Sequence, residues 1–298
     1  MRWKTGRRSS NIEDRRGAPT LGGLGSGRRL PLRGKSVGGG LGTIVLVLVA
    51  MYFGVDPSIF LGGGGGIGLA PTTQTQRPAN LSPEQRQLAD FVSVVLADTE
   101  DTWHAIFKAS GDTYEEPALV LFSGSTRSGC GVGEAEMGPF YCPADHKVYI
   151  DLSFYEDLKR RHGAPGDFAQ AYVIAHEVGH HVQTLLGISP KVQEAKRKVS
   201  RTEANQLSVR QELQADCFAG LWANHADRAR NILEQGDVEE ALTAATAIGD
   251  DRLQKQARGY VTPDSFTHGS SEQRVRWFKR GLSEGTLAAC NTFKADRL

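Results

Sequence analysis

The sequence predicts an α+β fold in which helices dominate over a small sheet, preceded by a single transmembrane helix. Three observations support this. Two short apolar runs follow residue 110, apolar residues recur at helical spacing through most of the chain beyond residue 153, and one long apolar run is uncharged until Asp56. With 298 residues, 39% of them hydrophobic, the chain can form one large domain with an appendage, and it has no glycine period of the collagen type.

Residues 1–37 are strongly basic. They carry ten Lys and Arg against Glu13 and Asp14, a net charge of +8, so the rest of the chain carries −7. Because the segment has no apolar periodicity, we predict a disordered cytoplasmic leader that contacts anionic lipid headgroups of the inner membrane. Nucleic-acid binding is the rival interpretation, but no interleaved aromatic residues or fold signature support it, and we predict no nucleic-acid partner.

Residues 38–56 are predicted to be a transmembrane signal-anchor, just long enough to cross a hydrocarbon core. A cleaved signal peptide is the alternative, but the leader is long for one and no clear small-x-small site follows. The basic leader orients the chain with its later part across the membrane, periplasmic or extracellular. Residues 57–79, rich in Gly, Pro and Thr, are predicted to be a linker.

The folded domain is predicted to span residues 80–298. Ser82 and Pro83 have the positions of a helix cap and first helical residue, and the apolar pattern that follows ends at Gly111. Strands are expected at 118–122 and 147–152. Helices are expected at 153–162, 167–186, 190–226, 237–257 and 271–280.

The four cysteines are expected to form two disulfides in a domain outside the cytoplasm, Cys130 with Cys142 and Cys217 with Cys290. A zinc site is the competing interpretation, but the chain has no Cys-x-x-Cys spacing. Free buried cysteines are the remaining alternative.

The strongest chemical signal is His176-Glu177-Val178-Gly179-His180 within an apolar helical pattern. Two histidines four residues apart project from one face of a helix and can bind one metal ion, while the intervening glutamate can act on a metal-activated water. The alternative is a pair of core histidines satisfied by hydrogen bonds.

A zinc peptidase site needs a third protein ligand, and Glu212 and Asp216 are again four residues apart on a predicted helix. One carboxylate can bind the ion while the other accepts the free ring N–H of a ligating histidine. A solvated helix face is the alternative, but the neighbouring Leu213, Phe218 and Trp222 favour burial.

Two further histidines are assigned other roles. His181 is adjacent to a ligand and so points away from the metal, as a structural hydrogen-bonding group. His268 can donate to a developing oxyanion. The alternative for its segment is that Ser270 or Ser271 caps a helix packed in the core.

Five segments together resemble the putative neutral zinc metallopeptidase family of bacteria, over most of residues 80–295. They are 138–145, 148–151, 176–181, 212–217 and 269–274. The Glu-x-x-x-Asp element also resembles that of the gluzincin proteases. The resemblance implies a zincin-like metalloprotease domain in which Glu212 is the third zinc ligand and Asp216 is the partner of a ligating histidine.

The sequence therefore predicts a membrane-anchored zinc metalloendopeptidase with one Zn²⁺, held by His176, His180 and Glu212, and a zinc-activated water with Glu177 as general base. The edge of the strand ending at Asp151 is expected to align a peptide or protein substrate. The alternatives are a membrane-tethered scaffold with a structural zinc, which has no use for Glu177, and a hydrolase of non-peptide bonds.

Overall fold

The structure of the protein is a computed structural model that describes residues 1–16 and 81–298. The predicted anchor at 38–56, the linker at 57–79 and the leader beyond residue 16 lie outside the described residues. Within the described ranges, no helix combines the length and the apolar character that crossing a membrane requires.

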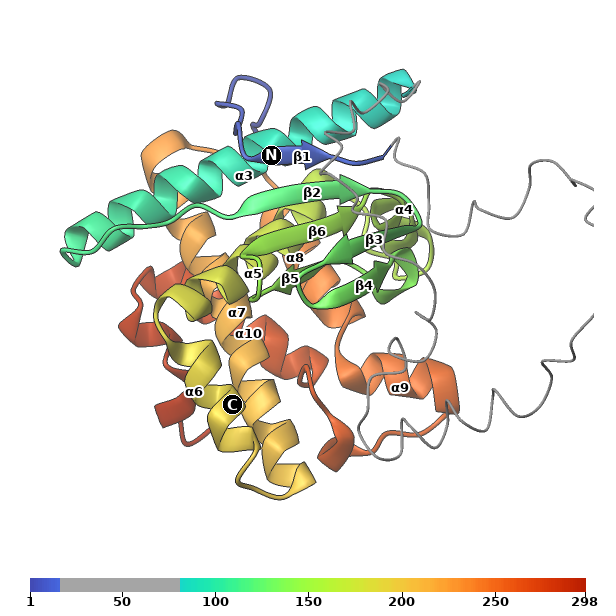
Figure 1. The fold of residues 1–298 in the computed structure, drawn as a ribbon, viewed down its shortest axis with the longest axis vertical. Coiled ribbons are helices and arrows are strands. Elements are labelled where there is room, and N and C mark those ends of the chain that lie inside the picture. Colours follow the sequence, from blue (N-terminus) through green and yellow to red (C-terminus); the bar gives the residue numbers. More distant parts are fainter. Residues whose placement is uncertain (17–80) are drawn as a thin grey trace, which may run out of the picture. The chain divides into compact units, whose positions relative to one another are not determined.

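The predicted helix-dominated α+β fold is confirmed for the described residues (Figure 1). The helices are α3 (Pro83–Ala109), α4 (Ser153–Arg160), α5 (Asp167–Leu185), α6 (Ile188–Lys196), α7 (Arg201–Arg230), α8 (Asp237–Ala247), α9 (Asp250–Arg258) and α10 (Ser271–Glu284). As predicted, α3 begins after Ser82, whose hydroxyl accepts a hydrogen bond from the Gln85 amide at 3.2 Å.

Two of the predicted helices are each divided in two. The prediction of one helix over 190–226 is wrong, because Ser200 forms a reciprocal capping box with Glu203 and starts α7 afresh after α6. The prediction over 237–257 is wrong because α8 ends at Ala247 and α9 begins only after Gly249. A Cβ at Gly249 would lie 2.5 Å from the Ser271 amide nitrogen, so this break lets the chain pass close to the start of α10.

The main sheet has four strands in the order β1-β2-β6-β5. The predicted strands are confirmed as β2 (Ala118–Phe122) and β6 (Lys147–Asp151), which pair in parallel, while β5 (Phe140–Cys142) pairs antiparallel to β6. Alternate residues of β2 point to opposite faces: Leu119 and Leu121 join the large core with the helices, and Val120 and Phe122 join a smaller cluster.

The strand that ends at Asp151 does not lie at an edge. The prediction that its edge aligns a substrate is wrong, because β6 is paired on both sides, to β2 and to β5. The outer strand on the side of α5 is β5. A separate hairpin, β3 (Ser125–Ser128) with β4 (Gly131–Glu134), packs Gly133 against the Phe140 ring.

Both predicted disulfides are confirmed. Cys130 bonds to Cys142 and joins the turn of the β3–β4 hairpin to β5, while Cys217 bonds to Cys290 and joins α7 to the C-terminal segment. No free cysteine remains in the described part of the chain.

The prediction of a disordered leader is wrong for residues 1–16. Strand β1 (Ile12–Asp14) pairs in parallel with β2, with Ile12 opposite Leu119. Trp3 packs edge-on against Phe91 of α3, their ring centroids 5.3 Å apart. Because β1 shares a sheet with the domain, residues 1–16 and 81–298 occupy one compartment in this fold, which disagrees with the predicted arrangement that separates them by a membrane.

Two basic side chains of this segment, Arg7 and Arg8, pair with carboxylates of helix α3. Arg8 binds Asp90 at 2.7 Å, and Arg7 binds both Glu100 and Asp101 at 2.8 Å. Glu100 of α3 is only 1% exposed, and its other hydrogen bonds come from Ser9 (2.5 Å) and Asn11 (2.9 Å). A buried carboxylate of the domain is thus satisfied by residues 7–11, which predicts that this segment is part of the folded core.

We expect the double change Ser9→Ala and Asn11→Ala to destabilise the fold by about 1–3 kcal/mol, since it removes two donors from the buried Glu100 carboxylate. The midpoint of urea denaturation measures the effect. Lys4→Ala, an exposed change in the same segment, is the control and should leave the midpoint unchanged. Equal midpoints for the two variants would show that the segment does not support the core.

Candidate metal centre

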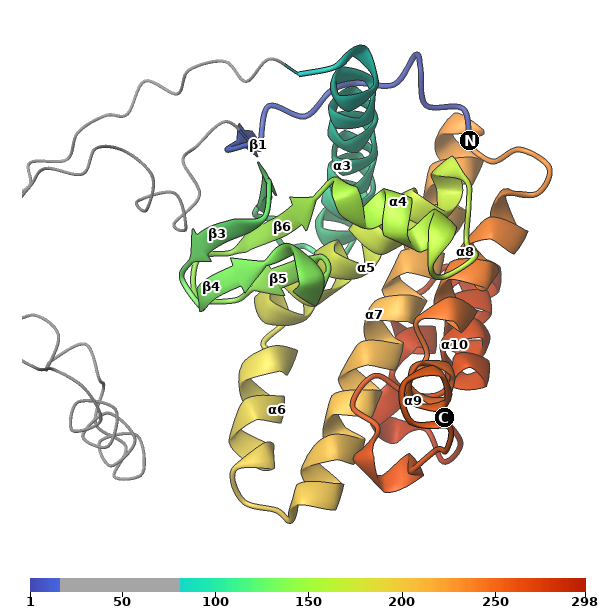
Figure 2. The same cartoon turned by 90° about the vertical axis from the view of Figure 1, so that its right-hand side faces the viewer.

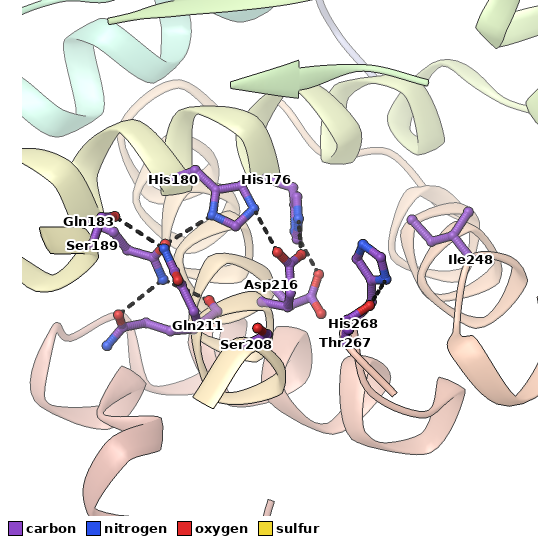
Figure 3. Close-up of polar contacts among 12 residues, drawn as sticks. His176, His180, Gln183, Ser189, Ser208, Gln211, Asp216, Ile248, Thr267 and His268 are labelled. Atoms are coloured by element: carbon purple, nitrogen blue, oxygen red, sulfur yellow. Dashed lines mark hydrogen bonds and ion pairs between the residues drawn. The ribbon is translucent and has the colours of Figure 1, made fainter. Parts of the chain in front are cut away.

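Helix α5 places His176 and His180 side by side, with ring centroids 4.8 Å apart (Figure 3). The helix is apolar and buried before them, with Val173 and Ile174 in the core, so its position is fixed by packing. His176 Nε2 lies 3.3 Å and His180 Nε2 lies 3.5 Å from the two carboxylate oxygens of Glu212. One ligand atom from each of the three residues lies within 4.8 Å of the others.

Glu212 reaches this position because α7 packs closely against α5. Gly179 lies between the two histidines, and a Cβ there would be 3.1 Å from the Ala215 carbonyl oxygen of α7. The absence of a side chain therefore lets the two helix backbones approach. Since Glu212 precedes Ala215 by one turn, its carboxylate meets the histidines one turn along α5.

The Nδ1 atom of each histidine is already engaged. Asp216 Oδ1 lies 2.9 Å from His176 Nδ1, and Gln183 Oε1 lies 2.9 Å from His180 Nδ1. Both partners are acceptors, so each Nδ1 carries a proton, and the neutral form of each ring would keep its lone pair on Nε2, directed towards Glu212. This is the tautomer that a metal ligand requires.

Asp216 is held by a buried network. The Arg274 guanidinium donates from Nε to Oδ2 and from Nη2 to Oδ1, both at 2.9 Å, and Tyr172 also donates to Oδ1. Arg274 comes from α10, which lies alongside α7 in both views (Figure 2). A Cβ at Gly281 would lie 1.9 Å from the Cys217 carbonyl oxygen, so glycine is what permits this contact.

The charges of the site favour a bound cation. Burial alone would lower the pKa of His176, but the Asp216 and Glu212 carboxylates outweigh it and raise the pKa to about 10. Burial likewise lowers and Glu212 raises the pKa of His180, with a net increase. The carboxylates therefore stabilise a positive charge at the two imidazole rings. A divalent metal ion can supply that charge while binding the same Nε2 and carboxylate atoms. Two histidines and one carboxylate form a donor set suited to zinc.

Glu177 and His268 line the same cleft as the three ligand candidates. The cleft has a volume of about 770 Å³. Glu177 is 8% exposed, and burial raises the pKa of its carboxyl above the ordinary 4.5. A carboxylate beside the histidines with an open cleft before it can exchange a proton with a molecule in the cleft.

His268 is oriented by Asp250, the first residue of α9. The Asp250 carboxylate accepts hydrogen bonds from the His268 amide (2.6 Å), the Thr267 amide (2.7 Å) and the Gly269 amide (3.1 Å). It also lies 3.2 Å from His268 Nδ1 and, mainly through this hydrogen bond, raises the pKa of His268 above 6.5. Ser270 caps α10, as the alternative interpretation of this segment expected. Capping and a role for His268 are therefore compatible.

His181 has the structural place expected of it, away from the ligand atoms. Its Nε2 donates to the Glu115 carbonyl at 2.7 Å, and its Nδ1 accepts from the Tyr141 hydroxyl at 3.1 Å. Burial lowers the pKa of His181 to about 4, so the ring is neutral. Through its contact with Tyr141, His181 joins helix α5 to strand β5.

A second group of carboxylates in the described residues is also spaced like a metal site. It comprises Asp167, Asp237 and Glu240. The Met1 ammonium lies 2.6 Å from Asp167 Oδ1 and 3.3 Å from Asp237 Oδ1, so a cation already occupies this cluster.

Sequence reasoning missed four residues of the site: Tyr172, Gln183, Asp250 and Arg274. Arg274 had a visible signal, because it lies three, four and seven residues before Trp277, Phe278 and Gly281, on the buried face of α10. A charged residue on such a face requires a buried partner. Gln183 had a weaker sequence signal, because it lies three residues after the candidate ligand His180.

These features are those of a metallohydrolase, and comparison with known proteins gives the family. The chain belongs to the family described as "putative neutral zinc metallopeptidase", whose sequence profile matches residues 1–293. The match includes the first residues, which pack on the domain.

The chain is similar over most of its length to several proteins, of which two serve as examples. The chain is 56% identical over 296 residues to the uncharacterized protein YpfJ of Escherichia coli (strain K12), covering 98% of this chain and 99% of the relative. It is 39% identical over 264 residues to the uncharacterized protein Rv2575 of Mycobacterium tuberculosis (strain H37Rv), covering 84% and 86%. No solved structure matches the chain.

Proposed function

We propose that this protein is a zinc-dependent endopeptidase in which His176, His180 and Glu212 hold one zinc ion. The observation that carries the proposal is the convergence of two Nε2 atoms and one carboxylate, with both Nδ1 atoms engaged elsewhere. Zinc in such a site supplies Lewis acidity towards a peptide carbonyl and lowers the pKa of water that it coordinates.

Glu177 is the proposed general base. Its carboxylate takes a proton from the water that attacks the peptide carbonyl and delivers the proton to the leaving amine. Its raised pKa suits this exchange, because a base works best with a pKa nearer the working pH. The same residue argues against the alternative of a scaffold with a structural zinc, which needs no acid–base group facing an open cleft.

His268 is the proposed oxyanion donor. Because Asp250 engages Nδ1, Nε2 carries a proton only in the imidazolium form, and the raised pKa favours that form. A protonated Nε2 facing the cleft can donate to the oxygen on which negative charge develops.

Strand β5 is the proposed platform for the substrate. Phe140 and Tyr141 line the cleft, and β5 is the outer strand of the sheet on that side. An extended peptide can add to such an edge through main-chain hydrogen bonds.

The experiment that tests the function is metal analysis of the purified chain, followed by digestion of a peptide library with and without a chelator. We expect about one zinc per chain and cleavage that stops on chelation and returns with zinc. Bound zinc without cleavage of any peptide would support the scaffold alternative instead.

The role of His268 predicts a pH dependence. As the pH rises through the raised pKa of His268, the imidazolium is lost, and we expect turnover to fall on this alkaline side. His268→Gln should lower turnover by about 10²-fold and abolish this fall of turnover on the alkaline side, the alkaline limb of the pH profile. Asp250→Asn should move the limb down towards pH 6.5, because it removes the carboxylate that raises the pKa. An identical alkaline limb in His268→Gln would exclude this role.

Attachment to a membrane through residues 38–56 and a location outside the cytoplasm remain predictions from the sequence, but a single pass that leaves residues 1–16 in the cytoplasm disagrees with the pairing of β1 with β2. The two disulfides favour an oxidising compartment. Fractionation of cells and thiol labelling of the protein before and after reduction test both points.

A further inference from the structure

The turn of α7 that carries Glu212 is held by the C-terminal segment Cys290–Ala295. The Thr292 hydroxyl donates to the Arg210 carbonyl at 2.6 Å, and the Arg210 guanidinium donates to the carbonyls of Thr292 and Ala295, the latter at 3.1 Å. Thr292 is fully buried. The backbone of α7 at Arg210, two residues before Glu212, is therefore held in place by the C-terminal segment.

A relay of buried amides connects the same segment to His180. Gln183 accepts from His180 Nδ1 and donates from Nε2 to the Gln211 carbonyl (2.7 Å) and to Gln214 Oε1 (3.1 Å). Gln214 in turn donates from Nε2 to the Cys290 carbonyl at 3.0 Å. Gln183 and Gln214 are 0% and 4% exposed, so water does not compete for these groups.

The direction of this relay is fixed at its far end. The Cys290 carbonyl can only accept, so Gln214 must present its NH₂ to it and its oxygen to Gln183. Gln183 must then present its own oxygen to His180. The Gln211 carbonyl accepts from the same NH₂ group of Gln183 and requires the same orientation, so the Gln211 and Cys290 carbonyls together direct the proton of His180 to Nδ1 and keep Nε2 free for a metal.

The disulfide between Cys217 and Cys290 fixes the position of that carbonyl. Cys217 lies on α7, five residues after Glu212, and both cysteines are fully buried. The bond ties the C-terminal segment to the helix that bears the third candidate ligand. The other disulfide, Cys130–Cys142, joins the β3–β4 hairpin to β5, and these elements carry no residue of the relay.

We infer that the Cys217–Cys290 disulfide and Gln214 form a brace that sets the zinc affinity of the site, by orienting His180 and holding the turn that bears Glu212. This inference rests on the proposed zinc site but not on peptidase activity. The brace positions the ligands and does not itself touch the metal.

The test is the zinc dissociation constant of the full-length chain, measured by competition with a chromophoric chelator at neutral pH. We expect Gln214→Leu and the pair Cys217→Ala with Cys290→Ala each to raise the zinc Kd about 10-fold or more, the usual effect of removing support from a metal ligand. The pair Cys130→Ala with Cys142→Ala is the matched control and should stay within about twofold of the wild type.

A second control separates ligand positioning from loss of stability. Leu221→Ala creates a cavity on α7 away from the relay and should destabilise the fold by about 2–5 kcal/mol, yet leave the zinc Kd unchanged. If the variant with both Cys217→Ala and Cys290→Ala does not fold, the zinc Kd of Gln214→Leu alone decides whether the brace sets the zinc affinity. A wild-type zinc Kd in Gln214→Leu, or a Kd raised equally in Leu221→Ala, would overturn the brace. Tight wild-type zinc binding without peptide cleavage would overturn only the proposed peptidase.

Discussion

Replacing Glu177 with Gln is expected to lower peptidase turnover by about 10²–10⁴-fold while the protein keeps its zinc. The amide matches the carboxylate in shape but cannot take a proton from the attacking water. Because Glu177 is not among the three groups that converge as ligands, the change removes the proposed base and spares the metal site.

Glu136→Gln is the matched control, because Glu136 lines the same cleft on an exposed position. It should retain turnover close to that of the wild type. Both variants are assayed for zinc content and for cleavage of one extended peptide. Wild-type turnover in Glu177→Gln would remove the general base from the proposed mechanism.

Replacing Arg274 with Met is expected to cost about 3–5 kcal/mol of stability, because it leaves the fully buried Asp216 without its cation. Lys279→Met is the control on the same helix. Lys279 is exposed, and its loss should change the free energy of unfolding by no more than about 0.5 kcal/mol. Urea denaturation measures both variants.

The acid limb of stability gives a second readout for Arg274. Burial alone would raise the pKa of Asp216, but Arg274 and His176 outweigh it and lower the pKa from 3.8 to about 2. A carboxyl with a depressed pKa stabilises the fold above pH 3.8, and that contribution is lost as the pH falls towards 2. Without Arg274 the pKa rises, so we expect acid unfolding to begin at a higher pH. Identical stability and acid unfolding in Arg274→Met would contradict the assigned ion pair.

The sequence was sufficient where the relevant contacts are local. His176, Glu177 and His180 follow from the spacing of one helix. The spacing of Glu212 and Asp216 on a second helix predicts a pair with two different roles, and in the structure the two carboxylates contact different ring nitrogens of His176. The capping of the first domain helix by Ser82 is equally local, and it is confirmed.

Long-range partners could not be predicted in the same way. Arg274 meets Asp216 across 58 residues, through a helix contact that Gly281 permits. The basic N-terminal segment was misjudged for a related reason. Its composition is that of a solvated leader, but its counter-charges on α3, such as Asp90 and Glu100, lie more than 80 residues further along the chain.

The ordered N-terminal segment also changes how the basic residues are understood. The lipid contact predicted for the basic leader competes, at Arg7 and Arg8, with carboxylates that these residues bind within the domain. The family profile begins at residue 1, in agreement with a segment that belongs to the fold.

The most direct test of the central claim is a crystal structure of the zinc-loaded protein, with anomalous scattering recorded at the zinc edge. The proposal predicts one peak bonded to Nε2 of His176, Nε2 of His180 and a carboxylate oxygen of Glu212, at about 2.0–2.2 Å. A peak elsewhere, or none in protein purified with zinc present, would contradict it.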